Sequence, residues 1–137
     1  MSRFVVAFFI CVAPFTVGCE SRPAAGLYNN SGKTLIGSVK QGHTPVIHRS
    51  LLGPGLWKVN SPWPKQVPET AIVSWQEGDG QQFERDVPVR SLVPRFFNGT
   101  VWFKIEPDRS VAVVPVSRDE ANEGTAGPDT WNRERRD

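Results

Sequence analysis

Apolar and polar residues alternate along much of the region 27–116, and this alternation predicts β-strands. In the segment 70–77, for example, Ala71, Val73 and Trp75 share one face of an extended chain. The same reasoning predicts about seven or eight strands. They are drawn from the segments 27–30, 34–40, 45–48, 56–59, 70–77, 81–87, 100–106 and 110–116.

Glycine and proline interrupt this region so often that helices have little room. The chain holds 12 of each among its 137 residues, and no stretch between them in 27–116 exceeds nine residues. An average helix is about 11–12 residues long. The longest such stretch, Glu69 to Glu77, is rich in β-branched and aromatic residues, which favour strands. The expected fold class is therefore all-β, a small antiparallel sandwich or open barrel of about seven strands.

Residue types also mark turns and one sheet edge. Gly78-Asp79-Gly80 predicts a hairpin loop, and Pro107-Asp108-Arg109 predicts a second turn. Asn30-Ser31-Gly32-Lys33 predicts the turn between the first two strands. Because Pro115 cannot donate to a ladder, the strand 110–116 is expected at a sheet edge.

The N-terminal segment has the layout of a secretory signal. Arg3 supplies a positive charge, Phe4 to Ala13 form an unbroken apolar run of ten residues, and Pro14 ends that run. The run is too short to span about 30 Å of hydrocarbon as a permanent helix. The ending Thr16-Val17-Gly18-Cys19 resembles a bacterial lipobox, in which lipid is attached to the Cys thiol before cleavage on its amino side.

Lipidation of Cys19 implies a cleaved signal peptide over 1–18 and a polar tether over 19–26. It also explains an otherwise unpaired thiol in an oxidising compartment, and two or three acyl chains would anchor the protein stably in a membrane. Glu20 stands where inner-membrane lipoproteins of enteric bacteria usually have Asp. This resemblance favours an outer-membrane lipoprotein facing the periplasm. Plain secretion and an uncleaved anchor are the alternatives.

The C-terminal stretch 117–137 differs in composition from the β domain. It holds ten charged residues, and its apolar side chains are Ala121, Ala126 and Trp131. Such a segment buries little surface to offset the entropy of ordering, which predicts a disordered tail. The alternative is a docking segment anchored by Trp131.

Composition counts against most catalytic and nucleic-acid functions. Sixteen basic against 14 acidic residues give a net charge of only +2, so nucleic-acid binding is not expected. His43 and His48 have no carboxylate between 34 and 66 as a local third ligand, so no metal site is expected, and the two histidines are interpreted as surface residues. The chain has no Gly-x-Ser-x-Gly elbow, and Leu27 replaces the first glycine of a phosphate-binding loop. We expect neither an enzyme nor a cofactor.

Two aromatic segments are the candidate partner-binding residues. Trp57 is expected to pack inward, whereas Trp63, between two prolines, is harder to place in a ladder. Arg95, Phe96 and Phe97 lie on the connection before the strand 100–106. Tryptophan, arginine and aromatic residues on rigid loops are typical of binding hot spots. A loop that covers the core is the other interpretation of the Trp63 segment.

The order of these features resembles one family of short proteobacterial lipoproteins, often encoded beside type VI secretion phospholipase effectors. The similarity rests on segments 26–31, 36–39, 71–75, 85–89, 101–103, 107–108 and 111–114, and covers about 80 residues. One departure is that Gly53-Pro54-Gly55-Leu56-Trp57 lacks the paired cysteines that family members carry there. Several such lipoproteins act as immunity proteins. The resemblance implies the same role for this chain.

The leading hypothesis is thus a membrane-tethered periplasmic domain that binds another protein, an immunity protein that inhibits a lipase-type toxin. Trp63, Arg95, Phe96 and Phe97 would occlude the mouth of the toxin's active site. The alternative is an accessory lipoprotein of an envelope or secretion machine, whose edge strand 110–116 could accept a partner strand. A lipid or small-ligand carrier would need an interior cavity, which a barrel of about 90 residues is too small to hold.

Overall fold

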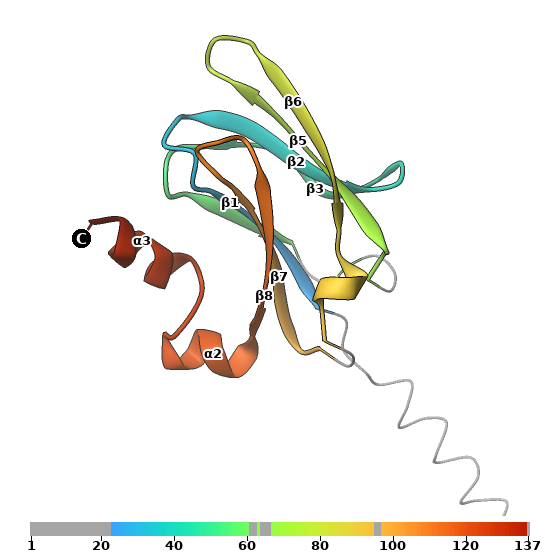
Figure 1. Ribbon diagram of the computed structural model, residues 1–137, viewed down its shortest axis with the longest axis vertical. Helices are drawn as coiled ribbons and strands as arrows, with labels where there is room; N and C mark the ends of the chain where they lie inside the picture. Colours follow the sequence, from blue (N-terminus) through green and yellow to red (C-terminus); the bar gives the residue numbers. More distant parts are fainter. Residues whose placement is uncertain (1–22, 61–62, 64–66, 95–96, 137) are drawn as a thin grey trace, which may run out of the picture.

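Two four-stranded β-sheets pack face to face in this protein (Figure 1). The computed structural model describes residues 23–60, 63, 67–94 and 97–136. The strand order is β4-β1-β7-β8 in one sheet and β3-β2-β5-β6 in the other. The strands are β1 (Ala24–Asn29), β2 (Leu35–Gln41), β3 (Thr44–Leu52), β4 (Trp57–Asn60), β5 (Thr70–Glu77), β6 (Gln82–Pro88), β7 (Gly99–Ile105) and β8 (Val111–Ser117), with the short 3₁₀ helix η1 (Arg90–Leu92) after β6. The predicted all-β class is confirmed, in its sandwich form.

Each predicted strand has a counterpart, and β5 matches its predicted bounds. The predicted inward face of β5 is also confirmed, because Ala71, Val73 and Trp75 are all buried. Strand pairing departs from the prediction at one place: β1 and β7 run parallel, whereas the other pairs are antiparallel. The connection between the end of β1 and the start of β7 is long enough for the crossover that a parallel pair requires.

The main core lies between the two sheets. Leu27 and Phe103 from one sheet meet Val39 and Val73 from the other, and all four are fully buried. Burying such side chains contributes about 1.5–3 kcal/mol each. β8 lies at the edge of its sheet, as Pro115 predicts.

A second apolar cluster lies on the outer face of the β1–β7–β8 sheet. Here the C-terminal segment forms α2 (Arg118–Glu123) and α3 (Pro128–Arg136), so the prediction of a disordered tail over 117–137 is wrong for the described residues (Figure 1). Trp131 is only 9% exposed and packs edge-on against Tyr28 and Trp102, with ring centroids 5.1 and 5.8 Å apart. The prediction counted the apolar residues of this segment and did not weigh how much surface the single Trp131 ring can bury.

Local signals also hold the C-terminal segment in place. Ser117 and Glu120 form a reciprocal capping box at the start of α2, and Gly124 ends the helix in a left-handed conformation. Trp131 therefore anchors a docked segment, but it docks on the chain's own sheet. The alternative interpretation of this segment, a docking segment anchored by Trp131, therefore describes the structure.

The β domain also begins earlier in the chain than the sequence predicted. Ala24 to Gly26 belong to β1 and not to a tether over 19–26, and a side chain at Gly26 would overlap the Trp102 ring. Cys19 and the proposed signal peptide over 1–18 lie outside the described residues. Among the helices of the described ranges, none has the length and apolar character needed to cross a membrane.

Candidate functional site

Of the four predicted partner-binding residues, the structure describes Trp63 and Phe97, and neither side chain is exposed. Trp63 lies outside any strand, as its neighbouring prolines favour, but its side chain is fully buried. The indole packs edge-on against Phe103 at 6.1 Å and donates a 3.3 Å hydrogen bond to the Ala24 carbonyl. The prediction that Trp63 contacts a partner is therefore wrong, and the alternative, a segment that covers the core, is correct. Exclusion from a ladder does not keep a tryptophan out of the core.

Phe97 is the other predicted partner-binding residue that the structure describes. Phe97 is half-buried and packs against the main core. Arg95 and Phe96 lie outside the described residues, so their predicted role stays a prediction.

The four sheet edges differ in how well they are protected against pairing with another strand. β3 carries Pro45 and an irregular register, β6 carries the charged run Glu84-Arg85-Asp86, and β8 carries Pro115. Prolines, charges and bulges are the usual protections of an exposed edge. β4 has no proline and one charge, that of Lys58, and all four of its residues are exposed. β4 is therefore the least protected edge among the described strands.

The backbone of β4 has hydrogen-bonding groups that its sheet does not use. The Asn29 N–H donates to the Leu56 carbonyl at 3.0 Å, and the register continues as Tyr28↔Trp57, Leu27↔Lys58 and Gly26↔Val59. Bonded and non-bonded pairs alternate along an antiparallel ladder. The backbone N–H and C=O groups of Trp57 and Val59 therefore point away from β1, in the geometry that a further strand would need.

The side chains at this edge supply apolar surface. Leu56 is 54% exposed, Trp57 38% and Val59 41%, so the expectation that Trp57 packs inward is wrong. Trp57 and Val59 lie opposite Tyr28 and Gly26, on the outer face of the sheet. We call residues 56–60 the β4 edge. Short apolar runs with free backbone groups are the usual acceptors of an incoming strand.

α3 lies beside the loop that precedes β4, and Asn132 fixes it to that loop and to β1. The Tyr28 hydroxyl donates to Asn132 Oδ1 at 2.5 Å, and Asn132 Nδ2 donates to the Gly55 carbonyl at 3.0 Å. Between the loop before β4 and the last turn of α3 lies a shallow hollow of about 410 Å³, which we call the arginine hollow. Its lining consists of Pro54, Gly55, Leu56, Asn132, Arg135 and Arg136.

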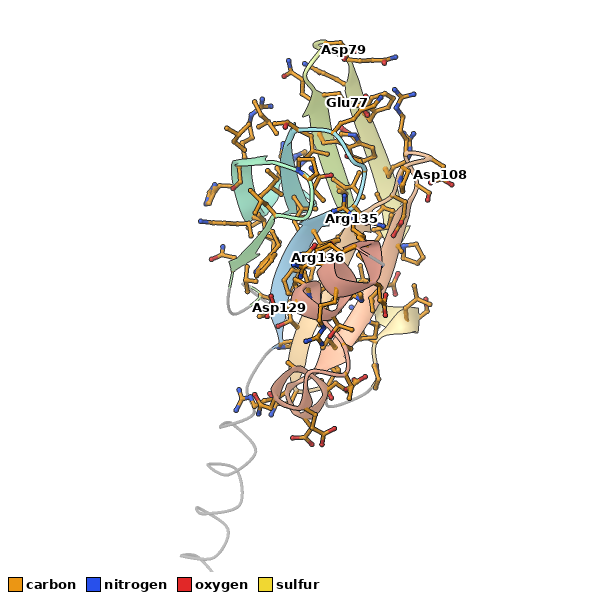
Figure 2. The ribbon with its side chains drawn as sticks, turned by 90° about the vertical axis from the view of Figure 1, so that its left-hand side faces the viewer. Glu77, Asp79, Asp108, Asp129, Arg135 and Arg136 are labelled. Atoms are coloured by element: carbon orange, nitrogen blue, oxygen red, sulfur yellow. The ribbon has the colours of Figure 1, made fainter. Side chains whose placement is uncertain are left out.

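Glu77, whose carboxylate is buried, lies apart from this surface near the β5–β6 hairpin and forms an ion pair with the half-exposed Arg109 (Figure 2 labels Glu77). Arg109 Nε and Nη2 donate to the two carboxylate oxygens of Glu77 at 3.1 and 3.0 Å, and Lys33 Nζ lies 3.5 Å away. The hydrogen bonds from Arg109 lower the pKa of Glu77 to about 2, although burial acts in the opposite direction. Glu77 is therefore ionised at neutral pH. It is not poised as a general acid, and it ties three turns together.

The described residues offer no other centre for chemistry. Within the ranges that the structure describes, no three His, Cys, Asp or Glu side chains are grouped closely enough to hold a metal ion. His43 and His48 are exposed, as expected from the sequence. Among the described residues, the feature best suited to binding is therefore the β4 edge of the sandwich, which could pair with the strand of another chain.

Comparison with known proteins adds no further constraint. No family model, curated protein or solved structure matches this chain.

Sequence reasoning missed the β4 edge and the arginines of α3 for two reasons. The segment 56–59 was predicted as a strand, but its place at an edge depends on long-range pairing. The signal that could have found it is the run Leu56-Trp57-Lys58-Val59, which has neither proline nor acidic residues. Arg135 and Arg136 fell in the predicted disordered tail.

Proposed function

We propose that this chain is a membrane-tethered periplasmic domain that binds another protein through the β4 edge. The observation that carries the proposal is the pair of outward-facing backbone positions, Trp57 and Val59, flanked by exposed apolar side chains. The proposed tether is lipid on Cys19, for which the lipobox-like sequence is the support. The partner adds a strand beside β4, on the side that faces away from β1.

In its most concrete form, the domain is an immunity protein that inhibits a lipase-type toxin delivered by a type VI secretion system. The support for this form is the resemblance to the lipoprotein family together with the lipobox-like sequence at Cys19. The β4 edge replaces Trp63 as the binding element. A strand of the toxin held at this edge would be withdrawn from the toxin's own active-site region.

The accessory function in an envelope or secretion machine is the second candidate, and the same observation favours it. A free strand edge serves an assembly partner as well as a toxin. For this candidate we place the acceptor at β4 and not at β8, because Pro115 removes a backbone donor from β8. The two candidates therefore predict the same surface and different partners.

The decisive variant is Val59→Pro. The Val59 N–H points away from β1, so proline at this position removes a donor to the partner without breaking a bond in the β1–β4 ladder. Val59→Thr is the matched control, because it keeps the N–H and the β-branched shape. Both are made in a soluble Cys19→Ala form and expressed in the periplasm of the native organism.

Captured partners are identified by mass spectrometry and compared between the two variants. We expect a partner that Val59→Thr retains and Val59→Pro loses, with equal thermal stability of the two proteins. A secreted hydrolase whose toxicity the protein suppresses on co-expression supports the immunity function, and a secretion component supports the accessory function. If Val59→Pro captures its partner as well as Val59→Thr does, the β4 edge is not the binding site.

A further inference from the structure

The arginine hollow lies directly beside the first residue of the β4 edge and is positively charged. Leu56 belongs to both features, and Arg135 Nη1 lies about 3.0 Å from the position that a Cβ on Gly55 would take. Figure 2 shows Arg135 and Arg136 close together on α3. The two guanidinium groups and the two outward backbone positions therefore form one continuous surface.

The charge of this hollow has no counterion among the described residues. Within residues 23–136, outside the gaps, no carboxylate oxygen lies within 4 Å of either guanidinium group. Arg136 Nε is bonded to the Asn132 carbonyl of its own helix at 3.3 Å, and no carboxylate of the β4 edge is available because residues 56–60 contain none. The planar donors of arginine match a carboxylate, which accepts two parallel hydrogen bonds.

We propose that the occupant of this surface is an acidic extended segment of the partner protein. Its backbone pairs with β4, an apolar side chain covers Trp57 or Val59, and a carboxylate beyond the Trp57 end enters the arginine hollow. The inference rests on the proposed function and narrows it, because it states the chemistry of the segment that the β4 edge selects. A neutral or basic segment would supply no carboxylate to Arg135 and Arg136, which have none within 4 Å among the described residues.

The position of the hollow favours a protein over a lipid surface. Leu56 pairs with Asn29, at the opposite end of β1 from Ala24 and the proposed tether. A strand of six residues separates these ends by about 17–20 Å. Phosphates of the anchoring membrane would lie at the Ala24 end, away from the hollow.

The test uses two synthetic peptides of alternating threonine and valine, one ending in Glu-Glu and the other in Gln-Gln. Binding to the soluble Cys19→Ala protein is followed by amide chemical shifts in NMR titrations. We expect the acidic peptide to shift the amides of Trp57 and Val59, and to bind about fivefold more tightly than the neutral peptide. In the double variant Arg135→Glu with Arg136→Glu this preference disappears. Arg118→Glu, a charge change on exposed α2, is the matched control and keeps the preference.

The outcomes separate this inference from the proposed function. Equal binding of both peptides at the β4 amides overturns the acidic specificity and leaves the edge intact. Absence of shifts at Trp57 and Val59 with either peptide overturns both. Sedimentation with phosphatidylglycerol vesicles that is lost in the double arginine variant would assign the hollow to membrane phosphates and overturn the inference. Hydrogen exchange in 128–136 of each variant checks that α3 remains docked.

Discussion

At the scale of single residues, the ion pair of Glu77 makes stability dependent on acid. Its pKa is lowered to about 2 by the hydrogen bonds from Arg109, from an ordinary value of 4.5. Because the pKa in the folded state is depressed, the carboxylate stabilises the fold above pH 4.5 and loses this contribution as the pH falls toward 2. We expect the melting temperature to fall across this window.

Glu77→Gln tests the source of that dependence. The variant has no carboxylate to protonate, so its melting temperature should start lower at pH 7 and change less between pH 5 and pH 2 than that of the wild type. Glu84→Gln, at an exposed position on β6, is the control and should keep the wild-type slope. An unchanged slope in Glu77→Gln would show that other carboxylates dominate the acid response.

Trp63 is the residue whose role differs most from the one its sequence suggests. Its side chain is fully buried against Phe103, so Trp63→Ala should destabilise the domain by about 3–5 kcal/mol. Urea unfolding followed by circular dichroism measures this loss. Under conditions where the variant is still folded, its affinity for the partner should be unchanged. A loss of affinity without a loss of stability would restore Trp63 to the interface.

At the scale of elements, α3 is held to the sheet by few contacts. Trp131 packs on Tyr28 and Trp102, Lys104 Nζ lies 4.5 Å from the centroid of its ring, and Asn132 bonds to Tyr28 and Gly55. Trp131→Ala should therefore release α3 while the sandwich stays folded. Hydrogen exchange would show loss of protection in 128–136 and retained protection in β5. Equal loss in both segments would mean that α3 is part of the cooperative core.

How far the elements could be predicted follows from the range of the interactions that form them. The strands β5 and β7 are visible in the sequence because alternation of side chains is a local property. The parallel pairing of β1 with β7 and the edge position of β4 depend on residues far apart in the chain. The same holds for Trp131, whose burial requires Tyr28 and Trp102 on distant strands. The site was missed because it is defined by these long-range neighbours.

At the scale of the whole molecule, the proposed tether and the proposed binding surface lie at opposite ends of β1. Lipid at Cys19 would leave only a few residues before Ala24 begins the sheet, so the Ala24 end would face the membrane. The loop before β4 and the arginine hollow, which adjoin Asn29, would then face the periplasm. This orientation would present the proposed binding surface to a soluble partner.

Substitution of Cys19 tests the tether itself. We expect the wild-type protein to sediment with outer membranes and Cys19→Ala to remain in the soluble periplasmic fraction, because acyl chains supply the anchoring free energy. Cys11→Ala is the matched control: Cys11 lies within the apolar run 4–13 and should leave the protein in the membrane fraction. Sedimentation of Cys19→Ala with the membrane would mean that the uncleaved apolar segment anchors the chain. In that case the protein would reside in the inner membrane, and a partner would have to reach it there.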